Sequence, residues 1–265
     1  MIREFFGFGG YQREPEGYLS WQHLVFVTSL LIVMTILALL IGKKYKGASE
    51  RDRNKVLIIA AIIMDGVEII KIIIHCVRAS DPMGWMNSLP LFLCSIQFIT
   101  IPLAALSRGR LKEASLDFIL MFGLLGALLG TYAAGNNYAV YPVISLENVV
   151  SGITHATAGF ACLYIGLTGM GSMKRKNFSL STVILLAFCV VAYVVNVFRG
   201  SNYMFLMRGD GTPYDILFNL LGGNKVLYPI SVFALFVVYM ILFHLIFHGI
   251  KKRRQAKKDT PVVAA

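Results

Sequence analysis

Cys94 and His155 are of the residue types that carry out covalent chemistry, and they lie in separate apolar stretches of the chain. A thiol attacks well only as the thiolate, and a neighbouring histidine can take its proton while a third polar group fixes the imidazole. Asn196, Asn202 or Glu68 is the candidate third group. Such a set of residue types is what covalent acyl transfer needs.

Each of these residues also has a simpler interpretation. A cysteine in a membrane helix is most often small apolar packing, and His155 or Asn196 can simply form hydrogen bonds between helices. Cys76 and Cys94 both lie toward the expected outer face, where a disulfide between them would be stable. The cysteines have no C-x-x-C spacing, so we expect no metal site, and nothing in the sequence calls for a cofactor.

Composition determines which elements must position these residues. The chain has 265 residues, of which 57% are hydrophobic and 15% charged, more apolar surface than a soluble domain can hide. Seven stretches are long enough to cross a bilayer, and in lipid such stretches must be helices. They are Leu24–Ile41, Val56–Val77, Leu89–Leu106, Phe118–Ala134, Val149–Leu167, Leu180–Phe198 and Val226–Phe247. The sequence therefore predicts an all-α, polytopic membrane protein built as a bundle of seven transmembrane helices.

The net charge of +11 gathers beside the expected membrane, mainly after the first helix and near the C-terminus. By the positive-inside rule the N-terminus is outside and the C-terminus is cytoplasmic. We expect a multi-pass protein of the cell (plasma) membrane that binds no nucleic acid. Residues 1–250 should form a single transmembrane domain, and residues 251–265 a disordered basic tail in the cytoplasm. The oligomeric state stays open.

This topology brings several polar residues to one level. Cys94 and His155 each lie about five residues below the outer surface, or roughly 7 Å at the helical rise. His75 and Asn196 come from helices running in the opposite direction and reach nearly the same level. The residues that follow the sixth helix, Ser201, Asn202 and Tyr203, continue this layer. We expect the candidate site in the outer leaflet.

The second predicted helix carries a stripe of ionisable residues: Asp65, Glu68, Lys71 and His75. At about 100° per residue they fall on one side of the helix. Ionisable groups at membrane depth usually face the bundle interior or water, so the stripe indicates a functional cavity. The alternative is that Glu68 and Lys71 pair and fasten the helix to its neighbours.

At these same residues the chain resembles the YwaF-type bacterial integral membrane proteins and their animal relatives among transmembrane acyltransferases. The similar stretches are SLPLFLCSI (88–96), the THA within SGITHATAGF (151–160) and NVFRGSNYMFLMR (196–208). The resemblance implies a phospholipid acyltransferase with Cys94 and His155 as the essential pair. The family usually has histidine where this chain has Phe92, which leaves open an altered substrate or lost activity.

We therefore expect a membrane transacylase. Cys94, deprotonated by His155, would take an acyl group from one phospholipid as a thioester and pass it to a lysophospholipid. Membrane phospholipids would be both substrate and environment. The outer-loop residues expected to hold the lipid head group are Arg199, Arg208 and Tyr203. Ser201 or Asn202 is expected to orient the site or donate to the developing oxyanion.

Two other functions fit the same sequence. One is a proton-coupled transporter that uses the stripe of Asp65, Glu68, Lys71 and His75 as a relay. The other is a lipid-binding membrane protein without catalysis. The first predicts that neutralising Glu68 abolishes function while Cys94→Ser is harmless, and the second predicts that His155→Ala changes stability or ligand affinity but no turnover.

Overall fold

The computed structural model describes the chain except residues 1, 81–82, 84, 86–87 and 260–265. Helices make up 77% of the chain, and the described part contains no strand. The chain divides into two compact units, Met1–Ser172 and Met173–Ala265, which we describe separately. The prediction of an all-α protein is confirmed.

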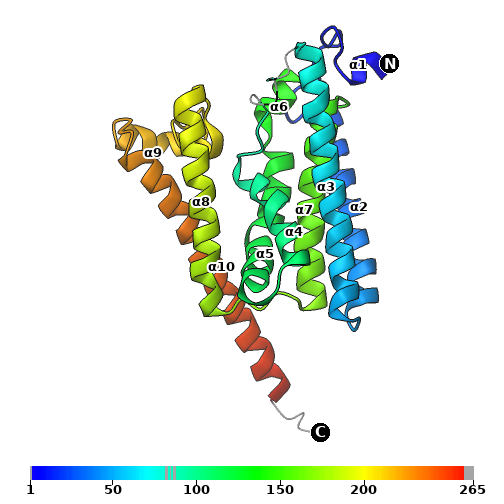
Figure 1. Ribbon diagram of the computed structural model, residues 1–265, viewed down its shortest axis with the longest axis vertical. Coiled ribbons are helices and arrows are strands. Elements are labelled where there is room, and N and C mark those ends of the chain that lie inside the picture. Colours follow the sequence, from blue (N-terminus) through cyan, green and yellow to red (C-terminus); the bar gives the residue numbers. More distant parts are fainter. Residues whose placement is uncertain (1, 81–82, 84, 86–87, 260–265) are drawn as a thin grey trace. The chain divides into compact units, whose positions relative to one another are not determined.

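The first unit, whose helices are labelled in Figure 1, carries both residues of the candidate catalytic pair. Its helices are α1 (Ile2–Phe5), α2 (Trp21–Tyr45), α3 (Glu50–Ala79), the 3-10 turn η2 (Leu93–Ile96), α4 (Gln97–Leu106), α5 (Gly109–Tyr132), α6 (Gly135–Val140) and α7 (Leu146–Thr168). Helix α7 lies at the centre and packs against α2, α3 and α5, while α4 packs against α3 and α5. Both α4 and α7, near which the candidate residues lie, thus pack against α5.

The ends of the long helices have recognisable signals. Ser49 caps α3 by accepting the N–H of Asp52 at 3.2 Å, and Ser145 caps α7 by accepting the N–H of Asn148 at 3.3 Å. Such caps satisfy N–H groups that have no partner within the helix. Gly169 ends α7 at a φ of +69°, a left-handed conformation that glycine adopts without steric cost.

The third predicted helix is shorter than expected. We expected a helix over Leu89–Leu106, but the chain is still extended at Phe92 and α4 begins at Gln97, after the η2 turn. Pro90 has no N–H to donate and disfavours helical geometry at the residue before it. Cys94 therefore lies on a 3-10 turn directly before the short helix α4, and not within a long helix.

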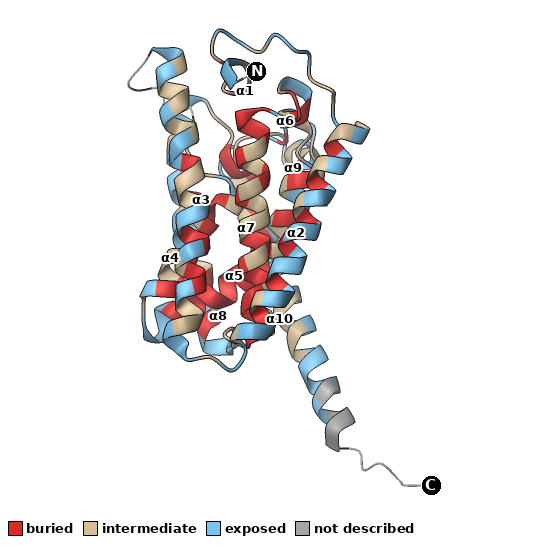
Figure 2. Ribbon diagram, turned by 90° about the vertical axis from the view of Figure 1, so that its right-hand side faces the viewer, coloured by how far each residue is buried: buried red, intermediate tan, exposed pale blue. Residues whose placement is uncertain are grey.

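Within the described residues, five helices are long and apolar enough to cross a membrane. They are Trp21–Tyr45, Gly109–Val140, Leu146–Thr168, Arg175–Arg199 and Leu227–Arg253. The apolar helix Leu93–Leu106 is shorter than these. In the first unit, buried residues lie where helices face one another (Figure 2), whereas apolar side chains such as Ile62 and Leu40 are 66% and 64% exposed. Apolar side chains on an outer helix face suit contact with lipid, so the chain is a multi-pass membrane protein.

The second unit contains α8 (Arg175–Arg199), the 3-10 turn η3 (Tyr203–Phe205), α9 (Tyr214–Leu220) and α10 (Leu227–Asp259). Gly200 ends α8 at a φ of +67°. Helix α10 runs to Asp259, so most of the segment that we expected to be a disordered tail continues α10 as a helix. The described basic residues of this extension, such as Lys251 and Lys252, are exposed.

Candidate functional site

Cys94 and His155 meet in the first unit. The Cys94 thiol comes from η2 and the His155 imidazole from the third turn of α7, and the two side chains interact through a hydrogen bond. The hydroxyl of the neighbouring Ser95 also interacts with the Cys94 thiol. Both Cys94 and His155 are half-buried. Cys162 and Cys189, in contrast, are buried.

Two glycines of α5 make room for this pair. A Cβ atom added at Gly130 would lie 2.0 Å from Nε2 of His155, a distance at which atoms collide. A Cβ atom added at Gly126 would lie 3.5 Å from Cβ of Cys94, an ordinary contact. The glycines are four residues apart on one helix face, a spacing that lets elements approach closely within membranes. This G-A-L-L-G pattern is visible in the sequence, but we had not linked it to the pair.

The tautomer of His155 is fixed by its own helix. Nδ1 of His155 lies 2.7 Å from the carbonyl oxygen of Ser151. Because a carbonyl can only accept, Nδ1 carries the proton and donates it to this bond. Nε2, the nitrogen beside Gly130, is then left with a lone pair. The imidazole has the protonation that a base for the Cys94 thiol requires.

The ionisable residues of the α3 stripe lie in different surroundings. Glu68 and Lys71 form an ion pair with a distance of 2.7 Å between Oε1 and Nζ, as the fastening interpretation predicted. Glu68 is 7% exposed, and the Lys71 ammonium lies close enough to His155 to act on it electrostatically. Lys71 thus places a positive charge near Cys94 and His155, and Glu68 compensates it.

Asp65 lies in different surroundings. It lines a groove of about 360 Å³ between α3 and α4, together with apolar residues such as Ile62, Ile69 and Pro102. Its Oδ1 atom is buried and has no hydrogen-bond partner among the described residues. Asp65 therefore takes no part in the Glu68 and Lys71 pair.

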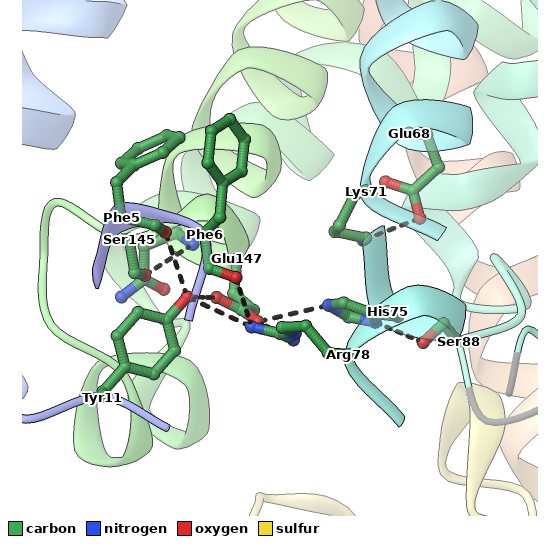
Figure 3. Close-up of polar contacts among 11 residues, drawn as sticks. Phe5, Phe6, Tyr11, Glu68, Lys71, His75, Arg78, Ser88, Ser145 and Glu147 are labelled. Atoms are coloured by element: carbon green, nitrogen blue, oxygen red, sulfur yellow. Dashed lines mark hydrogen bonds and ion pairs between the residues drawn. The ribbon is translucent and has the colours of Figure 1, made fainter. Parts of the chain in front are cut away.

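His75, the last member of the stripe, joins a polar network where α3 ends and α7 begins (Figure 3). The centre of this Glu147 network is the Glu147 carboxylate, which is 6% exposed and accepts hydrogen bonds from Tyr11, His75 and Arg78. The His75 bond measures 3.2 Å and the Arg78 bond 2.5 Å. Burial, together with the Glu147 carboxylate, raises the pKa of Tyr11, so this phenol stays protonated. The sequence alone had suggested no role for Tyr11, Arg78 or Glu147.

In the second unit, Asn196 holds the start of the loop that follows α8. Its Oδ1 accepts hydrogen bonds from the Tyr203 N–H at 2.7 Å and the Ser201 hydroxyl at 2.8 Å. Its Nδ2 donates to the Tyr203 carbonyl at 2.9 Å. Met204 follows with a φ of +57°, which is unusual for a residue other than glycine. These bonds give Asn196 and Ser201 a role in shaping the loop.

Asn202 organises the rest of the same loop. Its Oδ1 accepts the N–H groups of Met207 and Arg208, and its Nδ2 donates to Asp210 at 2.8 Å. Arg208 pairs with Asp210 at 2.6 Å and is largely exposed. Arg199 is exposed at the end of α8. The expected head-group and oxyanion roles of Arg199, Ser201, Asn202, Tyr203 and Arg208 stay predictions.

The cysteines and the possible metal ligands form neither a disulfide nor a metal site among the described residues. All four cysteines are free thiols, so Cys76 and Cys94 are not joined in this structure. Within the described residues no cluster of three or more histidine, cysteine, aspartate or glutamate side chains could hold a metal ion.

Most of the chain matches a known protein family. The sequence model of the TMEM164 family, a family of membrane proteins, matches residues 18–247. This stretch includes Cys94 and His155. No curated protein and no solved structure matches the chain.

Proposed function

The chain belongs to the TMEM164 family, and we propose that it is a membrane acyltransferase that moves a fatty acyl group between phospholipids through Cys94. The observation that carries this proposal is the hydrogen bond between the Cys94 thiol and an imidazole whose other nitrogen is held by the Ser151 carbonyl. The resemblance of the same stretches to transmembrane acyltransferases supports it further. Nucleophile, base and orienting acceptor are then all present.

The reaction has two steps. In the first, Nε2 of His155 takes the thiol proton while the Cys94 sulfur attacks the ester carbonyl of a phospholipid. The ester C–O bond breaks, the lysophospholipid leaves with the proton, and the acyl group remains as a thioester. In the second step His155 deprotonates the hydroxyl of another lysophospholipid, which attacks the thioester and regenerates the thiol. Lys71, near His155, favours negative charge in both transition states.

The proposed topology determines the donor. We infer seven crossings, with α3 and α4 completing the five longer apolar helices, the N-terminus outside and the C-terminus in the cytoplasm. Cys94 and His155 then lie in the outer leaflet of the plasma membrane. A cytosolic thioester could not reach them there, so the donor is another phospholipid. Both α3 and α4 depend on neighbouring helices in the membrane, because α3 carries Asp65, Glu68 and Lys71 and α4 has only 10 residues.

An acyl-transfer assay tests the proposal. The purified protein, reconstituted in lipid nanodiscs, receives a phospholipid with an isotope-labelled acyl chain and an unlabelled lysophospholipid. The proposal predicts a labelled product with two chains, which disappears with Cys94→Ala and with His155→Ala. Cys76→Ala is the matched control, because Cys76 is also a half-buried free thiol of the first unit. Transfer that survives Cys94→Ala would contradict the proposal.

A proton-coupled carrier is the second candidate, and the surroundings of Asp65 favour it. A buried carboxylate oxygen without a partner at membrane depth is costly unless it binds a proton or a ligand. If the protein is a carrier, Asp65→Asn should abolish the proton-driven uptake of its solute into proteoliposomes, and Cys94→Ala should leave this uptake unchanged. The acyltransferase predicts the reverse pattern in the acyl-transfer assay.

A further inference from the structure

Ser88, His75 and Glu147 form a chain of hydrogen bonds at the end of the first unit where α3 stops (Figure 3). Nδ1 of His75 lies 2.7 Å from the Ser88 hydroxyl, and Nε2 of His75 lies 3.2 Å from Oε1 of Glu147. The three residues come from different places: Ser88 precedes the Cys94 turn, His75 lies near the end of α3, and Glu147 is in the first turn of α7. A hydroxyl, an imidazole and a carboxylate in this order are the groups of a serine nucleophile with its base and orienting acid.

The positions of the protons agree with this order. A carboxylate only accepts, so the bond to Glu147 places the proton of a neutral His75 on Nε2. Nδ1 then has the lone pair, and it is the nitrogen that faces the Ser88 hydroxyl. The Ser88 hydroxyl must therefore be the donor to His75. His75 is placed to take that proton when the oxygen attacks.

Glu147 is held firmly enough to orient the imidazole. Tyr11 donates to its second oxygen, and Arg78 donates to the oxygen that His75 also uses. Arg78 is fixed in turn by the carbonyl of Phe6 at 3.1 Å. The carboxylate thus stays ionised although it is 6% exposed, since a paired and hydrogen-bonded charge tolerates burial.

The carboxylate is the most buried of the three groups. Side-chain exposure is 6% for Glu147 and 19% for His75, and Ser88 is half-buried. An orienting carboxylate in a dry position and a nucleophile open to ligand are what such a site requires. Arg78, one turn beyond His75, pairs with Glu147 and so balances the charge of the orienting carboxylate.

We propose that Ser88, His75 and Glu147 form a second catalytic site, a serine esterase acting on carboxylic esters of lipids at the outer surface. Ser88 Oγ attacks the ester carbonyl while its proton passes to His75. The ester C–O bond breaks, and the alcohol leaves with the proton from His75. Water then attacks the acyl-serine with His75 as base, which releases the free fatty acid and regenerates Ser88. The products are one acid and one alcohol for each water consumed.

A serine-directed fluorophosphonate probe tests this site on the purified full-length protein. The proposal predicts that the probe labels Ser88, located by peptide mass spectrometry, and that labelling is unaffected by Cys94→Ala. Ser88→Ala should abolish it, and Ser231→Ala, which removes an exposed serine hydroxyl of α10, should not. His75→Gln keeps side-chain hydrogen bonding but removes the base, so the labelling rate should fall roughly 100-fold or more.

Hydrolysis of a short-chain nitrophenyl ester gives a second reading of the same variants. Measured in a Cys94→Ala background, so that the Cys94 thiol cannot attack the ester, it should be lost with Ser88→Ala and with His75→Gln, while thermal melting of each variant shows that it is folded. Equal labelling and hydrolysis in the parent and Ser88→Ala proteins would overturn the proposal. So would His75→Gln labelling at the parent rate, because a purely structural link needs no base.

Discussion

His75 and His155, two of the three histidines of the first unit, have similar partners in different surroundings. Each has one nitrogen held by an acceptor and the other directed at a nucleophile: His155 between the Ser151 carbonyl and Cys94, and His75 between Glu147 and Ser88. The acceptor for His155 is uncharged, and that for His75 is a carboxylate. The Cys94 pair thus avoids a buried anion, and the Ser88 site can keep one because Arg78 compensates it.

This difference has a consequence for the nucleophiles. A thiol ionises far more readily than a hydroxyl, so Cys94 needs only a neutral imidazole nearby. A serine needs an imidazole that a carboxylate orients and stabilises as it becomes charged. The acceptor behind each histidine therefore matches the nucleophile in front of it.

The largest expected effect separates the two sites completely. Cys94→Ala should lower phospholipid acyl transfer by roughly 1,000-fold or more, because it removes the proposed nucleophile. Ser88→Ala should leave acyl transfer unchanged and abolish fluorophosphonate labelling. The acyl-transfer assay and the labelling reaction on both variants check this. If one substitution abolished both reactions, Cys94 and Ser88 would belong to a single site.

The next effect concerns the space for His155. Gly130→Ala places a Cβ 2.0 Å from Nε2, so the imidazole must move, and acyl transfer should fall on the order of 100-fold. Gly126→Ala is the matched control, since its Cβ makes an ordinary contact at 3.5 Å.

Both substitutions exchange glycine for alanine within α5, which favours the helix by about 1 kcal/mol. A loss of helix stability thus cannot account for the difference between them. Equal transfer rates in the two variants would show that the approach of Gly130 to His155 is not needed for the reaction.

Glu147→Gln should weaken the Ser88 site and spare the Cys94 pair. The substitution leaves Arg78 without its anionic partner, and breaking such a buried pair typically costs about 3 kcal/mol. We expect labelling of Ser88 to slow by roughly tenfold or more, since the imidazole loses its orienting carboxylate. Labelling kinetics and thermal melting measure the two effects. Glu16→Gln, which removes a carboxylate bound to the Val143 N–H, is the control.

The smallest effect is expected from Tyr11→Phe. It removes one of several donors to Glu147, and a single hydrogen bond contributes about 1 kcal/mol to stability. Acyl transfer should stay at the parent rate, and Ser88 labelling should fall only a few-fold. Complete loss of labelling would mean that the N-terminal segment itself takes part in the reaction.

Much of the fold could be predicted because long apolar runs in lipid have no alternative to helices. Each predicted stretch contains helix. The expected directions of those helices put Cys94 and His155 at one level, whereas their pairing was expected from their residue types and from the family resemblance. The start of the third stretch was wrong, since we gave no weight to Pro90. Its missing N–H delays the helix until after Cys94.

The Glu147 network could not be predicted in the same way. An acidic residue in the first turn of a helix, such as Glu147, is ordinary because it complements the helix dipole. Arg78 at the end of α3 has an equally ordinary explanation. Their pairing depends on how far α3 and α7 project past one another and on the path of residues 2–16, which periodicity does not encode. The G-A-L-L-G spacing of α5 was visible, but its partners were not.

Intact mass spectrometry of the protein after incubation with a labelled phospholipid tests the central claim most directly. The account predicts an added mass equal to one acyl group, which hydroxylamine removes because it is a thioester, and which is absent from Cys94→Ala and strongly reduced in His155→Ala. An acyl adduct of the same size on Cys94→Ala, or no adduct on the parent protein while acyl transfer proceeds, would contradict it.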